Sequence, residues 1–531
     1  MNTSTTNKPR QESDRQGEKK WYSAFMARPE IGPLGVMILL FCMLGYFSIP
    51  EGEFSLNPFS GEGFNALGIR NNFRVIAQLG IVALAAGMLI IAGEFDLSVG
   101  SMIGFAGGCM AMILKWGFAV VIPYISFKGG LHFEGLKLFE IRDVSPLLAI
   151  LITLCMTLSF GWIQGWIIVK SGISSFIVTL GGLFFLRGIT EVSYRAFNRA
   201  PDQTAGSTTV TDLPDIKNII NVPGLGEMER DAAKALPNDQ LLEILSNVPA
   251  STVAKLTERL SYINEKVATL KTEINSTKMI ETLEKSLAGA KKSGNDSMVE
   301  ILTKKIEAGV DVPAVTAKVV TDIDIAKAYI DTIFTARPVA NFFGGDIMEP
   351  VFNWLYFTVD WNVNNFGNIF AKGMYSALMI WGLIAFICYF ILSKTQAGNW
   401  IYSTGGNLNA AKANGVPTNK VKIALFVNTA FCATMFAACQ VFEVNTADTA
   451  KGNLKELEAI AAAVIGGVVL TGGFGTIGGI ILGTIIFGIA KEAFFYIPGI
   501  DGSFYRVFLG AVLVTAAFTN ENIRKRIMGN I

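Results

Sequence analysis

Ten long apolar runs dominate this sequence and constrain its fold more than any other feature. A helix needs about 20 apolar residues to cross the hydrocarbon core of a membrane. Charged residues make up 16% of the chain, whereas a water-soluble domain carries about 25%. The pattern predicts an all-α, polytopic membrane helical bundle of about ten spans, over residues 33–49, 73–93, 98–114, 145–168, 174–193, 374–393, 421–442, 457–471, 474–494 and 503–519.

Two of these runs and the start of the chain refine this prediction. The runs 98–114 and 457–471 are short and contain glycine, so each is a candidate for a broken or re-entrant segment. About thirty mostly polar residues precede the first run, an order that does not fit a cleavable signal peptide. We therefore expect the first span to remain in the protein as an anchor.

Basic residues outside the apolar runs predict the orientation. Lys and Arg concentrate in the N-terminal tail (1–30), in the loop 395–420, which has no acidic residue, and after residue 523. Such segments stay on the cytoplasmic side of a membrane. We expect all three to be cytoplasmic in a multi-pass protein of a bacterial inner membrane, because ten spans return the C-terminus to the side of the N-terminus.

Residues 202–345 interrupt the apolar pattern between the first membrane half (31–201) and the second (346–531). They contain 20 acidic and 16 basic residues, a density normal for a soluble domain. Apolar residues from Val253 to Ile274 alternate spacings of three and four, which is typical of a helical seam. With a turn near 293–295, this predicts a periplasmic helical hairpin. The seam packs either a small helical bundle or an intermolecular coiled coil.

Several functions are excluded by what the sequence lacks. A net charge of +1 argues against nucleic acid as a partner. The phosphate-binding pattern G-x-x-x-x-G-K-[ST] does not occur, so the chain is not expected to hydrolyse ATP. The single histidine, His132, is interpreted as a surface loop residue, and the six cysteines as apolar filler. We expect no enzyme activity, no cofactor and no metal site.

Three polar or glycine-rich segments are candidates for a functional role. In Glu94-Phe95-Asp96-Leu97-Ser98 the carboxylates are costly near a membrane core, which indicates function, although Asp96 or Ser98 is alternatively a cap of the next helix. Residues 405–415 suit a short helix that another protein approaches, or a plain surface helix. The glycines of 466–479 favour close helix packing over an anion site.

Four blocks of this sequence resemble a known family. They are Glu94–Ser101, Ser175–Gly181 with Arg187-Gly188, Gly405–Gly415, and Glu456–Gly467. In this order they are similar to the monosaccharide permeases of ATP-binding cassette importers, the ribose and xylose permease family. The residues Gly100-Ser101-Met102 and the block from Ser175 to Leu180 are most similar to the xylose permeases of this family. The resemblance covers about 31–194 and 374–526, and the insert 202–345 departs from it.

The resemblance implies a homodimer around a central path, in contact with membrane lipid. It also implies a cytoplasmic ATP-binding cassette ATPase as motor and a periplasmic sugar-binding protein. The ATPase-coupling residues it implies are Gly405, Gly406, Asn407, Asn409, Ala410, Ala411 and Gly415. Asn409 stands where the family has a glutamate. The translocation-path residues it implies are Glu94, Asp96, Ser98, Thr179, Arg187, Glu456 and Glu458.

The expected function is therefore translocation of a monosaccharide, with a pentose such as xylose favoured and ribose, galactose and other polyols left open. One alternative is a stand-alone secondary transporter or channel for small polar solutes. It would predict ionisable residues in mid-span, and the runs contain few. Another is a membrane-anchored interaction or sensor protein with the insert as its working domain.

Overall fold

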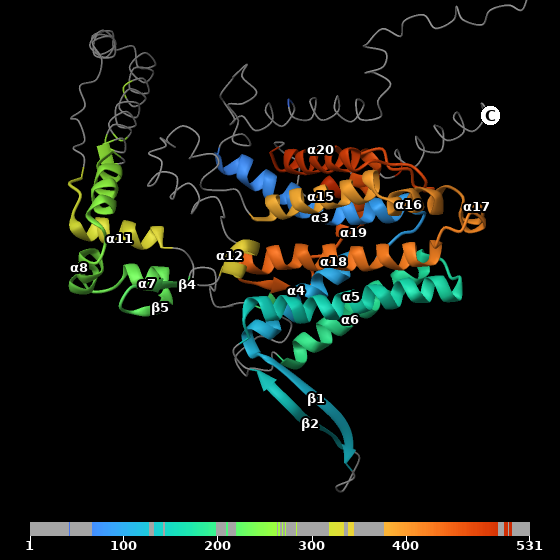
Figure 1. Cartoon of the computed structure of the whole chain (residues 1–531), viewed down its shortest axis with the longest axis horizontal. Coiled ribbons are helices and arrows are strands. Elements are labelled where there is room, and N and C mark those ends of the chain that lie inside the picture. Colours follow the sequence, from blue (N-terminus) through green and yellow to red (C-terminus); the bar gives the residue numbers. More distant parts are fainter. Residues whose placement is uncertain are drawn as a thin grey trace, which may run out of the picture. The chain divides into compact units, whose positions relative to one another are not determined.

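The computed structural model describes residues 66–126, 132–141, 144–197, 209–210, 219–262, 318–333, 338–344, 376–496 and 504–507, with single residues elsewhere. The chain forms two compact units. The membrane unit comprises residues 1–216, 339–349 and 364–531, and the insert unit comprises 217–338 and 350–363. Figure 1 shows the elements of both units.

Six helices of the described part are long and apolar enough to cross a membrane. They are α3 (Ala66–Ile91), α4 (Val99–Trp116), α5 (Pro146–Ser171), α6 (Ser175–Phe197), α15 (Ser376–Lys394) and α18 (Thr418–Val444). They correspond to the second to seventh predicted spans. The first predicted span, 33–49, lies outside the described residues except for Cys42, and the tenth is described only in part.

The eighth predicted span, 457–471, is not one continuous helix, in agreement with the alternative that this run is a broken segment. Helix α19 (Lys455–Ile465) has 11 residues, or about 17 Å at 1.5 Å per residue, which is too short to cross. It ends before Gly467, whose φ is +87°, and the chain then forms a loop as far as α20 (Ile477–Tyr496). Hydropathy alone suggested a longer helix because residues 466–470 are also apolar.

Helix α3 lies at the centre of the membrane unit and contacts α15, α18, α19 and α20 (Figure 1). Nearly every side chain between Ile76 and Ala92 is buried. In contrast, three helices expose large apolar side chains, as expected where lipid replaces water. These side chains include Leu151, Trp162 and Trp166 of α5, Phe184 and Phe185 of α6, and Leu383, Phe386 and Phe390 of α15.

Small residues bring α5 and α18 together. A Cβ on Gly161 would lie 2.7 Å from the Phe426 carbonyl oxygen, and one on Gly165 would lie 2.9 Å from Ile423 Cα. Close backbone approach of this kind is the usual basis of helix association in lipid. One turn away, the hydroxyls of Thr157 and Thr434 are 2.7 Å apart and share a buried hydrogen bond. The pair α5–α18 is thus fixed by both packing and polarity.

The membrane unit also contains strands that the sequence analysis did not predict. β1 (Phe118–Ser126) pairs antiparallel with β2 (His132–Ile141). The β-branched and aromatic residues of 120–125 favour this conformation. The interpretation of His132 as a loop residue is wrong, because it begins β2 opposite Ser126. The short strands β3 (Thr209–Val210) and β6 (Ala447–Asp448) also pair, and α12 (Pro338–Gly344) packs on α18 near Phe442.

The insert unit has its own small core. A hairpin of β4 (Ile219–Val222) and β5 (Gly226–Glu229) leads into α7 (Arg230–Lys234), α8 (Asn238–Ser246) and later α11 (Asp322–Thr332). The core side chains are Ile220, Val222, Ala233, Leu241, Ile244, Ala326 and Ile330. Residues 250–262 are helical, and the rest of the predicted helical hairpin lies largely outside the described residues.

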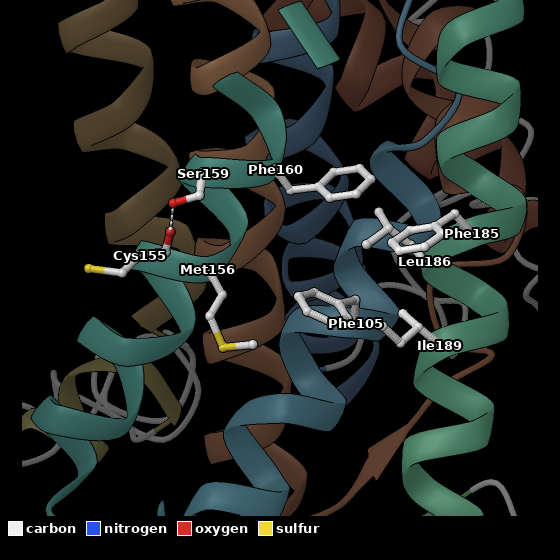
Figure 2. Close-up of a pocket in the computed structure, with 8 residues that line it drawn as sticks. All are labelled: Phe105, Cys155, Met156, Ser159, Phe160, Phe185, Leu186 and Ile189. Carbon is white, nitrogen blue, oxygen red and sulfur yellow. Dashed lines mark hydrogen bonds between the residues drawn. The ribbon is translucent and has the colours of Figure 1, made fainter. Parts of the chain in front are cut away.

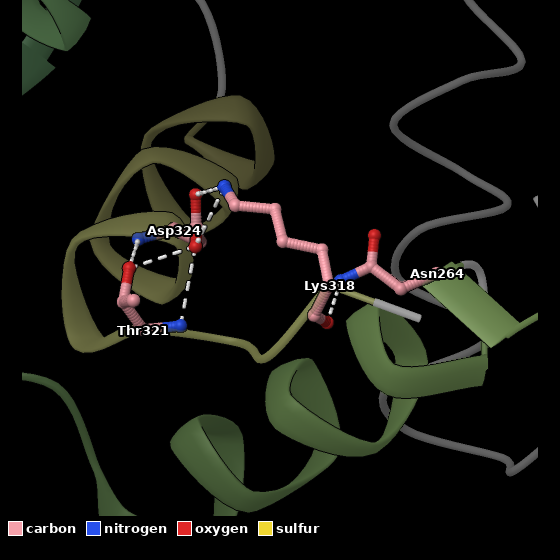
Figure 3. Close-up of polar contacts among 4 residues, drawn as sticks. All are labelled: Asn264, Lys318, Thr321 and Asp324. Carbon is pink, nitrogen blue, oxygen red and sulfur yellow. Dashed lines mark hydrogen bonds and ion pairs between the residues drawn. The ribbon is translucent and has the colours of Figure 1, made fainter. Parts of the chain in front are cut away.

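Two polar clusters fix the ends of α11. Arg230 donates to the carbonyls of Ile330 and Ile333 at 2.7 and 2.8 Å. At the other end, Thr321 and Asp324 form a capping box, and Lys318 pairs with Asp324 at 3.0 Å (Figure 3). These contacts satisfy backbone groups that a helix leaves free at its ends.

Candidate functional site

The segment Gly93–Ser98 joins α3 to α4 and is tied to α6 by two hydroxyls. The Phe95 amide donates to Ser175 Oγ at 3.2 Å, and the Leu97 amide donates to Thr179 Oγ1 at 3.1 Å. The sequence has no regular structure here because Gly93, with φ +82°, ends α3. Ser175 and Thr179, one turn apart on α6, therefore replace the missing helix partners of this backbone.

Asp96 is the polar centre of this segment. Its Oδ2 accepts from the Thr429 hydroxyl of α18 at 2.6 Å, and its Oδ1 accepts from the Ser98 amide at 2.9 Å. Ser98 Oγ lies 2.6 Å from Asp96 Oδ1 and 3.1 Å from Gln164 Oε1 of α5. The cluster is buried, so these bonds link three helices where water does not compete.

The capping prediction is right in one respect only. Asp96 accepts the amide of Ser98, but the Ser98 side chain makes no capping bond. Among the described residues, no side chain accepts from the amides of Val99, Gly100 or Ser101. The N-terminus of α4 is thus buried with its first-turn amides uncapped.

Glu94 has an ion-pair partner at the start of α18. Its carboxylate pairs with Lys422, and both side chains are largely buried. Glu94, Asp96, Ser98 and Thr179 therefore lie in one connected cluster.

Four glycines bring three distant segments into contact behind this cluster, a contact that we call the glycine junction: Gly93, Gly405, Gly472 and Gly473. The Gly473 amide donates to the Ile91 carbonyl at 2.8 Å. A Cβ on Gly405 would overlap that carbonyl oxygen and lie 2.7 Å from Gly473 N. Beside the junction, the Tyr402 hydroxyl donates to the Gly475 carbonyl at 2.7 Å. Only glycine permits this approach.

The loop 395–420 contains α16 (Gln396–Gly406) and α17 (Leu408–Ala413). Asn407 accepts from the Ala410 amide at 3.0 Å and so caps α17. Asn409, Ala410 and Gly415 are exposed, and Ala411 is buried. Of the predicted coupling residues, Gly405 thus belongs to the glycine junction, and Asn409, Ala410 and Gly415 are accessible to another protein.

The remaining predicted residues lie at α19 and α6. Glu458 is 1% exposed and pairs with Lys455 at 2.6 Å and Lys491 at 3.3 Å, so its charge is compensated. Glu456 is 6% exposed, and its Oε2 has no hydrogen-bond partner in the part of the chain that the structure describes. Arg187, half-buried on α6, lies within electrostatic reach of Glu456. The two glutamates of α19 therefore have different surroundings. Glu456 lies near the cluster of Asp96, and Glu458 pairs with two lysines.

The model of a family described as "Branched-chain amino acid transport system / permease component" matches residues 68–222 and 322–517. The matched residues include every segment of the candidate site and leave 223–321, within the insert, unmatched. The chain belongs to this permease family. It is a multi-pass protein of the bacterial inner membrane and a permease component, not an enzyme.

Three relatives illustrate the similarity of this permease to characterised proteins. The ribose import permease protein of Escherichia coli (strain K12) is 31% identical over 150 residues, 28% of this chain and 46% of the relative. The xylose transport system permease proteins of Escherichia coli (strain K12) and Haemophilus influenzae are 22% and 21% identical, covering 88% and 85% of this chain and 88% and 86% of the relatives. The chain thus spans about half the length of the ribose relative and most of the xylose relatives. No solved structure matches it.

A groove of about 430 Å³ lies between α4, α5 and α6 of the permease. Figure 2 shows apolar side chains around it, including Phe105, Met156, Phe160 and Phe185. The Ser159 hydroxyl is already bonded to the Cys155 carbonyl at 2.7 Å. A groove without free polar groups cannot replace the hydration shell of a polar solute, so we do not assign it to transport.

Sequence reasoning missed several members of the permease site: Gln164, Ser175, Lys422 and Thr429. Gln164 and Thr429 interrupt apolar runs, and a polar residue within a membrane span is a usable signal of function. Nothing in the sequence pairs Lys422 with Glu94, which lies 328 positions away.

Proposed function

We propose that this permease is the transmembrane subunit of an ATP-binding cassette importer that translocates a monosaccharide, with a pentose such as xylose favoured. The names and coverage of the xylose transport relatives support this substrate class. Import against a concentration gradient needs a source of energy, and the whole sequence lacks the P-loop pattern of an ATPase. A separate cytoplasmic ATPase would therefore supply the energy.

The observation that carries the coupling part of this proposal is the glycine junction. It joins the segment of Asp96 to the loop of exposed residues Asn409 and Gly415 by backbone contacts at Gly405. In this proposal the ATPase binds the exposed part of 405–415. Its movement reaches Gly93–Ser98 through α16 as a rigid-body displacement, and the Asp96 bonds to Thr429 and Ser98 pass it to α18 and α4.

The proposed organisation follows the orientation rules. The N-terminal tail (1–30), the loop 395–420 and the C-terminus would be cytoplasmic, and the insert 202–345 would be periplasmic. A periplasmic sugar-binding protein would then deliver sugar on the side of the insert. A second copy of the permease would complete the path together with the halves 31–201 and 346–531.

Reconstitution tests the function. The permease is placed in liposomes with and without the ATPase and binding protein encoded beside it, and uptake of labelled xylose is measured. Uptake should require ATP, the ATPase and the binding protein together. Uptake by the permease alone, driven by a proton or sodium gradient, would instead favour a secondary transporter.

A deletion separates the accessory and receptor roles of the insert unit. Because the unit has its own core of Ile220, Leu241 and Ile330, removing it need not unfold the membrane unit. We expect loss of binding-protein docking with ATPase binding retained. Full transport without the insert would contradict a docking role.

A further inference from the structure

The first turns of α4 and α19 meet inside the membrane unit. A Cβ on Gly100 would overlap both Glu456 Oε2 and the Gly452 carbonyl oxygen. One on Gly104, a turn further along α4, would overlap the Thr449 carbonyl oxygen. The segment 449–456 therefore packs directly on one glycine face of α4, and the two helices start next to each other within the protein.

Both of these helices begin without a side-chain cap. Neither Ser98 before α4 nor Leu454 before α19 makes a capping bond. Leu454 has φ +64°, a left-handed conformation that is strained for a residue with a branched side chain. Strain of this kind collects at functional sites. At α19 the Lys455 amide donates to the Gly452 carbonyl at 3.1 Å, so among the described residues the uncapped amides at this meeting point belong to the first turn of α4.

Two buried side chains of these first turns have unmet hydrogen bonds. Glu456 Oε2 of α19 and Ser101 Oγ of α4 both lack a partner among the described residues, and the two residues are 6% and 4% exposed. An unsatisfied buried polar atom costs free energy, and most native proteins avoid it. Side chains that remain unsatisfied in one state are expected to gain a partner in another.

The charges around this point decide the kind of partner. The positive ends of two helix dipoles and the charge of Arg187, which lies within electrostatic reach of Glu456, disfavour a bare cation. Glu456 and the nearby Asp96 disfavour an anion. A hydroxyl group both donates and accepts, so it can bond the carboxylate of Glu456 and also the hydroxyl of Ser101 or the free amides. An uncharged, hydroxyl-rich solute satisfies every group.

We propose that Glu456, with Ser101 and the uncapped first turn of α4, forms a sugar-hydroxyl contact site in the translocation path. The site is closed here, with Glu456 against Gly100, and opens when the segment 449–456 separates from α4. This assignment rests on the proposed function, because it requires that the permease carries a sugar.

The test measures hydroxyl recognition in the complete importer in proteoliposomes. D-xylose and its deoxy analogues, each lacking one hydroxyl, are supplied with binding protein saturated, so that delivery is equal. The variants are Glu456→Gln, which keeps shape and hydrogen bonding, Glu456→Leu, which removes both, and Ser101→Ala. Glu191→Gln on α6 is the matched control. Glu191 follows Thr190, and a Cβ on Gly108, about two turns along α4 from Gly100, would lie 3.2 Å from Thr190.

A hydrogen bond to a charged group is worth about tenfold or more in affinity, and one to a neutral group less. We therefore expect wild type to disfavour one analogue by about tenfold, Glu456→Gln to disfavour it less, and Glu456→Leu not to discriminate. Ser101→Ala should weaken the same preference or a neighbouring one, and Glu191→Gln should match wild type.

Three results would overturn the assignment. Equal discrimination in wild type, Glu456→Gln and Glu456→Leu would make Glu456 a packing residue, with sugar import itself intact. Uptake that depends on sodium in wild type and loses that dependence in Glu456→Gln would make it a cation site. Absence of ATP-driven uptake of any sugar by wild type would overturn the proposed function and this site with it.

Discussion

Substituting Gly405 by alanine tests whether the glycine junction transmits movement. Its Cβ would overlap the Ile91 carbonyl oxygen and lie 2.7 Å from Gly473 N, so it would separate the donor and acceptor of the 2.8 Å bond between them. Overpacking costs about 1–3 kcal/mol, and a lost buried backbone bond costs a similar amount. We expect about 2–6 kcal/mol of destabilisation in total.

The neighbouring residue provides the control. Gly406 is exposed, and a Cβ there would be 4.0 Å from its nearest neighbour, Gly473 Cα. Both substitutions exchange the same atoms at consecutive positions of α16. Only Gly405→Ala should lower the thermal midpoint of the purified permease, by several degrees, whereas Gly406→Ala should leave it nearly unchanged.

The functional readout is sugar imported per ATP hydrolysed in proteoliposomes. Coupling between two sites is typically worth 5- to 150-fold, so Gly405→Ala should lower this ratio by about tenfold while the ATPase still binds. An unchanged ratio in a folded Gly405→Ala permease would refute the role of the junction. Equal losses in both variants would place the effect in α16 as a whole.

Three further predictions concern other parts of the chain. Gly415 has φ +78° and open space around it. Gly415→Asn, which tolerates that conformation, should retain import, whereas Gly415→Phe should uncouple ATP hydrolysis from uptake. Equal sugar uptake by these two variants would argue against docking of the ATPase at Gly415. Thr429→Val removes the donor to buried Asp96 and should lower the free energy of unfolding, measured by thermal unfolding, by about 1.5–3 kcal/mol. The control Thr484→Val loses only a bond to its own helix and should lower the free energy of unfolding less. Bonds from the Thr321 hydroxyl and Lys318 lower the pKa of Asp324 from 3.8 to about 2. The stabilisation of α11 by Asp324 is therefore present above pH 3.8 and is lost as the pH falls toward 2. Amide exchange in the first turn of α11 should rise over that range, and an unchanged exchange rate would contradict this prediction.

Long apolar runs predicted the second to seventh spans because hydropathy over about 20 residues reflects a physical requirement of the bilayer. The same measure failed at 457–471, since the break after Ile465 depends on the backbone of Gly467 and on packing of Gly466 against Gly479. It also missed β1 and β2. Their residues, from Phe118 to Ile141, are apolar over too short a length to indicate a span.

The sequence identified residues of the candidate site, but it did not predict which of them are in contact. The sequence singled out Asp96 and the loop at 405–415, which lie more than 300 positions apart. That Gly405 touches the end of α3 depends on how α16 and the loop after α19 fold onto it, and no local pattern encodes this. The bond between Asp96 and Thr429 is of the same long-range kind.

Photocrosslinking from Asn409 is the most direct test of the central claim, that a separate cytoplasmic motor binds this permease at 405–415. One variant carries a photoreactive residue at exposed Asn409, and a second variant carries it at exposed Glu243 of the insert unit. Intact cells that produce either variant are illuminated. Asn409 should crosslink to the ATPase, and Glu243 should not. Crosslinking of the ATPase from Glu243, or labelling of Asn409 by a reagent confined to the periplasm, would contradict the account.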